Sequence, residues 1–404
     1  MRNVVFVAPF PLDTTLRFAR AAAALPGVRF LGIAQEPPRG DDASLFADLV
    51  TVRDGLDSRQ LIEAAELLQR RHGPLHRVLG ILEPLQVQLA QVRAALGVSG
   101  TSPDTADLFR NKARMKDELR RHGLPCARHK LLRTWDDAVA FVDEVGLPIV
   151  LKPPAGMACK ATWRIKSKDE LRAAMIAIHA SPSEPALAEE FLRGSEYSFE
   201  TITVGGEVRF TSISRYEPSP LEVMETPWIQ WVCVLPRDVS GPELADAHEL
   251  GRRAVSALGL ETGFTHMEWF RRDDGSLAIG EIAARPPGAN IVRMNSFAHD
   301  VDMYRAWARA VVDDAFDGPW ARKYAVGCAF LRGAGRGRVV RVTGADRAQE
   351  LVGRHVVEAR LPTIGAPKSD SYEGDGHVIV RDPDTAVVRA ALKTIIETIQ
   401  VHYG

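Results

Sequence analysis

The sequence predicts a mixed α/β protein (α/β with α+β parts) that begins with an open parallel sheet and continues into a small lid-like unit and a hairpin-rich body. Three observations carry this prediction. Apolar strands alternate with helices over the first hundred residues, which is typical of a parallel sheet. A strand–loop–strand–helix unit follows residue 125, and further on two apolar strands flank the turn signal "DDGS". The chain of 404 residues has room for roughly two to four domains.

The first part of the chain alternates strands and helices in a regular order. Strands are expected at 3–9, 28–35 and 77–84, and helices at 13–27, 57–73 and 85–97. Sheets of this kind bind ligands beyond the carboxyl ends of their strands. Glu83, at the end of the third strand, therefore either faces a ligand or complements the dipole of the next helix.

Two common nucleotide-binding motifs are absent. The first strand is followed by "APFPLD" rather than GxGxxG, and no GxxxxGK[ST] occurs. The Gly-rich "GAGRGR" (333–338) precedes a strand instead of a helix and is interpreted as a turn. The sequence therefore argues against a Rossmann dinucleotide site and excludes a P-loop.

The segment after residue 101 contains well-marked helix starts. One helix is expected from Ser102, with Pro103 in its first turn, to Gly123 and Pro125. Thr134 begins a second helix that ends at Gly146.

A strand and a third helix complete the lid-like unit. The strand "LPIVLKPP" (147–154) carries Lys152 near its end, and a shorter strand "TWRIKS" follows. Ser167 and Glu170 then form a capping box for a helix that reaches about His179. The unit is small enough to act as a mobile lid.

The "DDGS" turn brings two carboxylates together. If Asp274 and Gly275 form a two-residue turn, the numbers of cross-strand partners sum to 549, and Glu268 lies directly opposite Glu281. Their Cβ atoms would be roughly 4.5–5.5 Å apart. Two such charges repel unless one is protonated or a cation lies between them, and Mg²⁺ is the first choice for oxygen ligands. The alternative is a longer turn that shifts the register by one residue and leaves one glutamate facing solvent.

Four further residues are candidates for a substrate pocket. Arg285 follows the second glutamate strand, and its planar guanidinium suits a carboxylate or phosphoryl group; the alternative is a surface arginine beside a turn. Tyr216, Trp228 and Trp231 lie between strands of the body and either line a pocket or belong to the core.

Composition excludes several classes of partner. The content is 46% hydrophobic and 25% charged with a net charge of −1, so no nucleic-acid or anionic-membrane partner is expected. The four cysteines are scattered without metal-ligand spacing, which argues against structural zinc. With no 18-residue apolar span and no signal-peptide pattern, we expect a cytoplasmic protein.

Four segments appear in the order typical of one family: "RNKARMKDELRRHGLP", "IVLKPP", "LAEEFLRGSEYSFE" and "HMEW…GEIAARPPG". Together they resemble the ATP-grasp superfamily of carboxylate–amine ligases, most closely its L-amino-acid ligase branch. The resemblance implies an ATP-grasp fold with a Rossmann-like domain at 1–101, an ATP-grasp domain at 102–319 and a C-terminal subdomain at 320–404. Within the second domain it implies a lid at about 125–187 and a catalytic body at 188–319.

The resemblance also implies roles for individual residues. Mg²⁺, or alternatively Mn²⁺, would bind to Glu268 and Glu281, and Arg285 and Lys152 would be catalytic. The residues implied in ATP binding are Lys112, Lys152, Lys160, Glu189, Glu190, Leu192 and Glu196.

Two positions depart from the family pattern. Ala283 stands where most members carry an asparagine that completes the metal site. Because the numbers of cross-strand partners sum to 549, His266 is expected opposite Ala283. The phosphate loop "PPAGMACKATW" keeps only Gly156, and Lys160 is expected to supply charge in place of backbone N–H groups.

The implied reaction is phosphoryl transfer to a substrate carboxylate, followed by attack of an amine on the acyl phosphate. The expected partners are a small-molecule carboxylate and an amine, with a homodimer as one expected assembly. Three other readings stay open: an ATP-dependent carboxylase of the biotin or purine type, an ATP-binding module without turnover, and a glycosidase pair, which fits poorly because no aromatic cleft accompanies the two carboxylates.

Overall fold

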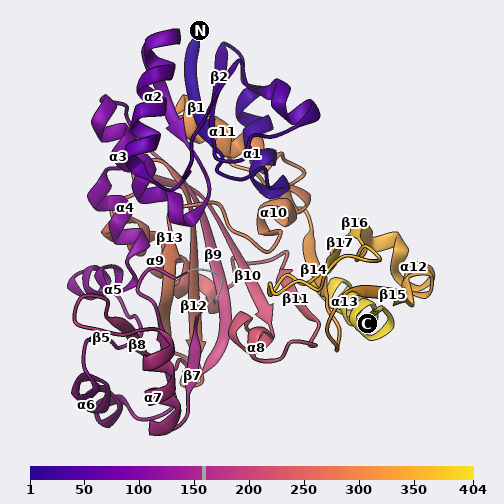
Figure 1. The fold of residues 1–404 in the computed structure, drawn as a ribbon. Coiled ribbons are helices and arrows are strands. Elements are labelled where there is room, and N and C mark those ends of the chain that lie inside the picture. Colours follow the sequence, from indigo (N-terminus) through magenta and orange to yellow (C-terminus); the bar gives the residue numbers. More distant parts are fainter. Residues whose placement is uncertain (157–160) are drawn as a thin grey trace.

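The computed structural model describes residues 1–156 and 161–404. Within these residues the strands form four sheets: one parallel, one of eight antiparallel strands, and two smaller ones. Figure 1 shows the N-terminal sheet at the top, the lid at the lower left, the large sheet in the centre and the C-terminal elements at the right. The predicted mixed α/β class is confirmed.

The N-terminal sheet is parallel, as the strand–helix alternation predicts. Its strand order is β3-β2-β1-β4, and each pairing is parallel. The strands are β1 (Arg2–Val7), β2 (Val28–Ala34), β3 (Asp48–Thr51) and β4 (Leu75–Leu79), and the helices α1 (Asp13–Ala23), α2 (Ser58–His72) and α3 (Gln86–Leu96). The short edge strand β3 was not predicted, because its four residues are only half-buried and carry no clear alternation.

The single helix predicted from Ser102 is wrong: two helices occur, α4 (Pro103–Arg110) and α5 (Lys112–Arg121). Asn111 between them adopts an extended conformation, and its side chain accepts hydrogen bonds from the backbone of Ala113 and Arg114. The break gives Asn111 the role of N-cap for α5, and the lysines of α5, Lys112 and Lys116, contact the lid at Gly156 and Glu189.

The lid is a four-stranded antiparallel sheet with two helices packed against it. Its strands pair in the order β5-β8-β6-β7. The elements are β5 (His129–Leu132), α6 (Trp135–Val145), β6 (Ile149–Lys152), β7 (Trp163–Ile165), α7 (Lys168–Ala177) and β8 (Ala186–Glu190). Thr134 and Asp137 form a capping box at the start of α6. Ser167 caps α7 as predicted, but the Glu170 side chain accepts from the backbone of Lys166 instead of Ser167, so the predicted Ser167–Glu170 box is only half formed.

The body and the C-terminal part share one eight-stranded sheet, in the order β13-β12-β9-β10-β11-β14-β17-β16. Its strands are β9 (Gly194–Val204), β10 (Glu207–Glu217), β11 (Trp231–Leu235), β12 (Gly263–Arg272), β13 (Leu277–Ala283), β14 (Ala325–Leu331), β16 (Val356–Arg360) and β17 (Gly376–Asp382). The boundary predicted at 320 precedes β14, which pairs with β11, so the sheet continues across it.

Helices and a small sheet cover the large sheet. The helices are α8 (Pro220–Glu225), α9 (Pro242–Ala257), α10 (Ile291–His299), α11 (Met303–Asp313), α12 (Ala345–Val352) and α13 (Thr385–Thr398), and β15 (Val339–Thr343) pairs with β18 (Gln400–Tyr403). In the described part of the chain, no helix combines the length and the apolar character needed to cross a membrane.

The β12–β13 hairpin reaches the predicted pairing by a different route. The turn has three residues, because Arg272 pairs with Ser276, so the predicted two-residue turn is wrong. Near the turn the register is therefore shifted by one, and Trp269 faces Ile279. A bulge at Gly280 shifts the register back, and Glu268 lies opposite Glu281 as predicted.

Candidate active site

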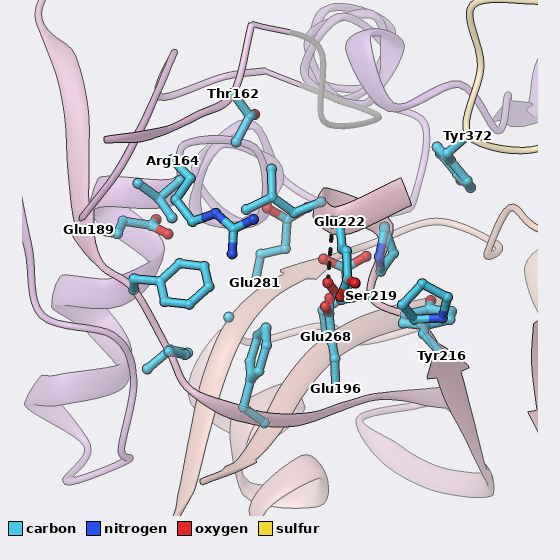
Figure 2. Close-up of a pocket in the computed structure, with 18 of the residues that line it drawn as sticks. Thr162, Arg164, Glu189, Glu196, Tyr216, Ser219, Glu222, Glu268, Glu281 and Tyr372 are labelled. Carbon is cyan, nitrogen blue, oxygen red and sulfur yellow. Dashed lines mark hydrogen bonds between the residues drawn. The ribbon is translucent and has the colours of Figure 1, made fainter. Parts of the chain in front are cut away.

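One cavity of about 620 Å³ lies between the lid, the β8–β9 hinge and the large sheet. The lid contributes Lys152 and Arg164, and the hinge contributes residues 189–196. Figure 2 shows Glu196, Glu268 and Glu281 around this cavity, with Glu189 on the lid side and Tyr216 and Tyr372 on the opposite side. The cavity thus brings together most of the residues that the sequence singled out.

Lysines and glutamates alternate along the lid side of the cavity. Lys152 Nζ lies 2.9 Å from Glu189 Oε2 and 3.5 Å from Glu281 Oε2. Lys112 Nζ lies 3.4 Å from the same oxygen of Glu281 and donates a hydrogen bond to the carbonyl of Gly156 at 3.0 Å. Burial alone would raise the pKa of Glu281, but the lysines outweigh it and hold that pKa well below its usual range. Glu281 is therefore a carboxylate at neutral pH.

Lys116 belongs to the same array and was not predicted. It is fully buried, its Nζ lies 3.1 Å from Glu189 Oε1, and it donates a hydrogen bond to the carbonyl of the bulge residue Gly280. Burial lowers the pKa of Lys116 despite Glu189. Lys112 and Lys116 are four residues apart and thus share a helix face, which is the sequence signal that could have indicated Lys116.

Three carboxylates meet on the sheet side of the cavity. Glu196 is 9% exposed and makes no side-chain hydrogen bond or ion pair with any described residue. Its burial, together with Glu268 and Glu281, raises its pKa well above the usual range. Within the described residues, no group of three or more His, Cys, Asp or Glu side chains is placed to hold a metal ion by itself. A cation bound here could take carboxylate oxygens from the two facing strands β12 and β13, and its remaining positions would be filled by water or a substrate.

His266 lies next to this carboxylate group, on the strand position opposite Ala283. Its Nδ1 lies 3.1 Å from Glu200 Oε1, and its Nε2 lies 3.8 Å from Glu268 Oε1. Burial would lower the pKa of His266, but the two carboxylates raise it to about 9. His266 is therefore protonated at neutral pH, and its imidazolium neutralises part of the charge of Glu268.

Arg285 lines the cavity and is not a free surface arginine. Its Nε donates a hydrogen bond to Glu83 Oε2 at 2.8 Å, and its Nη1 donates to the carbonyl of Pro286 at 2.9 Å. Glu83 is 7% exposed, pairs with Arg285 and does not line the cavity, and it also lies in the first turn of the 3-10 helix Glu83–Leu85 that precedes α3, as the helix-start alternative expects.

Three further residues were predicted to bind ATP: Glu190, Leu192 and Lys160. The Glu190 side chain accepts hydrogen bonds from the backbone and Nε of Arg128 and lies 3.1 Å from Arg272 Nη2, so its oxygens are engaged within the protein. Leu192 lines the cavity. Lys160 lies outside the described residues.

Of the three aromatic candidates, one lines the cavity. Tyr216 does so, with its hydroxyl 3.4 Å from His266 Nε2. Trp231 is fully buried and stacks on Phe330, and Trp228 is 60% exposed on the surface. Trp231 therefore belongs to the core, whereas Trp228 neither lines the pocket nor belongs to the core.

A family model described as "ATP-grasp domain" matches residues 117–296, which include the lid, the hinge and the carboxylate hairpin. The chain contains an ATP-grasp domain. The resemblance stated from the sequence motifs is thereby confirmed at the level of the superfamily.

Known proteins similar in sequence to this chain include an amino acid ligase. The L-arginine-specific L-amino acid ligase of Bacillus subtilis is 26% identical over 268 residues, which cover 65% of this chain and 64% of that protein. The match thus spans under two-thirds of the relative's length.

Two solved structures illustrate the shared fold. The L-amino acid ligase of Bacillus licheniformis superposes with a TM-score of 0.81 at 18% identity, covering 100% of this chain and 99% of that chain. The carboxyaminoimidazole ribonucleotide synthase of Aspergillus clavatus, complexed with ATP, gives 0.72 at 19% identity and 98% of each chain. The predicted ATP-grasp fold is confirmed.

Proposed function

We propose that this protein is an ATP- and Mg²⁺-dependent carboxylate–amine ligase that activates an amino-acid carboxylate as an acyl phosphate and transfers the acyl group to an amine. The observation that carries the proposal is the position of Lys152, between Glu189 at the hinge and Glu281 in the hairpin, within one cavity that also reaches Arg285. A nucleotide bound in this cavity would have Lys152 near its phosphates, and Arg285 would be available to bind a substrate carboxylate.

The adenine end of the nucleotide would lie at the hinge. Both oxygens of Glu189 face lysines, so the proposal assigns adenine contacts chiefly to the backbone up to Leu192, and the ribose hydroxyls to Glu196. Glu190 braces the hinge through Arg128 and Arg272 and contributes to the nucleotide site only through its backbone.

The phosphate end would lie between the hairpin and two lysines of the array, Lys112 and Lys152. Lys112 and Lys152 have buried stems and charged ends in the cavity, so they would neutralise the phosphates as fixed point charges. On binding, the phosphates would replace Glu281 as the lysines' partner and release that carboxylate.

Glu268 and Glu281 would hold Mg²⁺, with Mn²⁺ as an alternative ion, because hard cations are bound by one or two carboxylates plus substrate phosphates and water. When bound, the ion would reduce the charge of the transferring phosphoryl group. His266 would balance the remaining charge of Glu268 from the side on which Ala283 carries no ligand atom.

The acyl-transfer half of the reaction would use Arg285. Its free N–H groups would first hold the substrate carboxylate and then the oxyanion that forms when the amine attacks the acyl phosphate. The amine displaces phosphate from the acyl carbon, so the products are ADP, phosphate and an amide. The similarity to the arginine-specific L-amino acid ligase supports amino acids as both substrates.

The experiment is a measurement of ADP and phosphate release with ATP, Mg²⁺ and all pairwise amino acids, with bicarbonate as a separate arm. The proposal expects release that requires an amino acid and yields a dipeptide or amino-acid amide. Release that depends on bicarbonate alone would instead establish the carboxylase alternative. ATP binding without release in either arm would establish a binding module.

A further inference from the structure

Glu83 connects the N-terminal domain to the catalytic end of the cavity. It lies in the 3-10 turn Glu83–Leu85, just after β4, whereas Arg285 follows β13 in the body. A carboxylate that is 7% exposed requires a partner, because an unpaired buried charge is expensive. Arg285 is that partner, at 2.8 Å.

The contact constrains which edge of the arginine faces the cavity. A guanidinium has five N–H groups in one plane. Glu83 accepts from Nε and the carbonyl of Pro286 accepts from Nη1, which fixes the plane of the group. The N–H groups on Nη2 and the second one on Nη1 are left for a ligand. Arg285 lines the cavity and Glu83 does not, so Glu83 would not touch a substrate there.

The second oxygen of Glu83 points to the phosphate side of the site. Arg110 Nη1 lies 3.6 Å from Glu83 Oε1 and donates to the carbonyl of Gly156 at 3.0 Å. Lys112 Nζ donates to the same carbonyl at 3.0 Å. One carboxylate thus lies between the arginine at the substrate end and the loop at the phosphate end.

We infer that Glu83 is a positioning residue, which fixes the guanidinium plane of Arg285 so that its Nη2 edge meets the substrate carboxylate and the later oxyanion. The inference rests on the proposed ligase function for its kinetic consequences, but the orientation of Arg285 is a property of the protein without substrate. Misplacing such a group by about 1 Å costs on the order of 100-fold in rate.

The kinetic test compares Glu83→Ala with Glu83→Gln and with the control Asp48→Asn. Asp48 is also in the N-terminal domain and pairs with Arg71 and His72, far along the chain from the cavity residues. We expect Glu83→Ala to lower kcat about 100-fold with the KM for ATP changed less than twofold, and Glu83→Gln, whose amide oxygen still accepts from Nε, to recover most of the rate. A parallel change of kcat, KM for ATP and Tm in Glu83→Ala and Asp48→Asn would overturn the inference.

A second test needs no turnover and so separates this inference from the proposed function. Solvent exchange of the Arg285 Nε–H is measured by ¹⁵N NMR, with the resonance assigned by its loss in Arg285→Lys. We expect at least about tenfold faster exchange in Glu83→Ala and near wild-type exchange in Glu83→Gln. Equal exchange in the wild type and Glu83→Ala would refute the positioning role even if ligase activity is found. Protection by Glu83 in a protein without ligase activity would leave the role intact and overturn the proposed function alone.

Discussion

Glu268 and Glu281 lie directly opposite each other across β12 and β13, and a bulge at Gly280 produces this pairing. The three-residue turn would otherwise bring Gly280 opposite Glu268. The bulge is held from both sides, since Lys116 donates to the Gly280 carbonyl and Ile279 pairs with the segment at Pro125 and Ala127. The carboxylate pair is thus built by a local irregularity of the hairpin, as is common for bulges beside active sites.

Glu281→Gln tests the carboxylate pair. Removing one of the two proposed ligands should raise the Mg²⁺ concentration needed for half-maximal activity by at least about tenfold. ATP binding measured without Mg²⁺ should be retained or tightened, because Lys112 and Lys152 lose a competing carboxylate. Glu207→Gln, at an exposed strand start, is the matched control. An unchanged Mg²⁺ titration in Glu281→Gln would exclude this residue as a ligand.

Lys116→Met tests whether the buried lysine supports the array. The variant leaves Glu189 with only Lys152 and removes the donor to the Gly280 carbonyl. We expect the free energy of unfolding in urea to fall by about 3 kcal/mol, the lower end of the range for a broken buried pair, because Lys152 remains. Lys168→Met, an exposed lysine of α7, should change it by less than about 0.5 kcal/mol. An unchanged free energy of unfolding in Lys116→Met would show that Lys116 does not stabilise the array.

Arg164 and Glu225 form a contact between the lid and helix α8 of the body. Arg164 Nε donates to Glu225 Oε1 at 2.9 Å, and Nη2 contacts the other oxygen. Arg164→Ala should weaken lid closure, so the share of ATP hydrolysed without amide formation should rise several-fold. Arg172→Ala is the control, because Arg172 stacks on Trp135 inside the lid. The charge reversal Arg164→Glu with Glu225→Arg should restore the coupling of ATP hydrolysis to amide formation. Failure to restore it would show that this ion pair does not hold the lid closed.

His299 should make stability depend on pH. Burial lowers its pKa to about 4, so the folded state binds this proton less readily than the unfolded chain. The contribution of neutral His299 to the free energy of unfolding is complete above about pH 6.5 and is lost as the pH falls toward 4. This loss amounts to up to about 3 kcal/mol. His299→Phe should remove this part of the acid destabilisation, measured as the free energy of unfolding between pH 7 and 4.5. The same pH slope in both proteins would show that other groups cause it.

Sequence patterns located the candidate residues whose chemistry and position in a strand or turn indicate the same site. Lys152 at a strand end, Glu268 with Glu281 across a turn, and Arg285 at the end of the hairpin strand all lie in one cavity. The pairing prediction reached the correct partners although its turn was one residue too short. Asp-Gly signals a hairpin, but the loop length and a compensating bulge depend on contacts from α5 and the segment before β5, which no local pattern contains.

Residues that act across domains were harder to predict. Lys116 looks like an exposed helix lysine, and only the packing of α5 against β13 buries it. The partner of Glu83 is 202 positions away along the chain, so its role depends on tertiary structure alone. The predicted domain limits and site roles stay predictions, as do the oligomeric state and localisation.

The most direct test of the central claim uses substrate labelled with ¹⁸O in its carboxylate. Formation of an acyl phosphate and attack by an amine break the bond between the acyl carbon and one labelled oxygen, which leaves with the phosphate. The measurement is mass spectrometry of the released phosphate after dipeptide synthesis with the substrate pair found active. The account predicts one ¹⁸O atom per phosphate. Unlabelled phosphate, or label transferred to AMP, would contradict it.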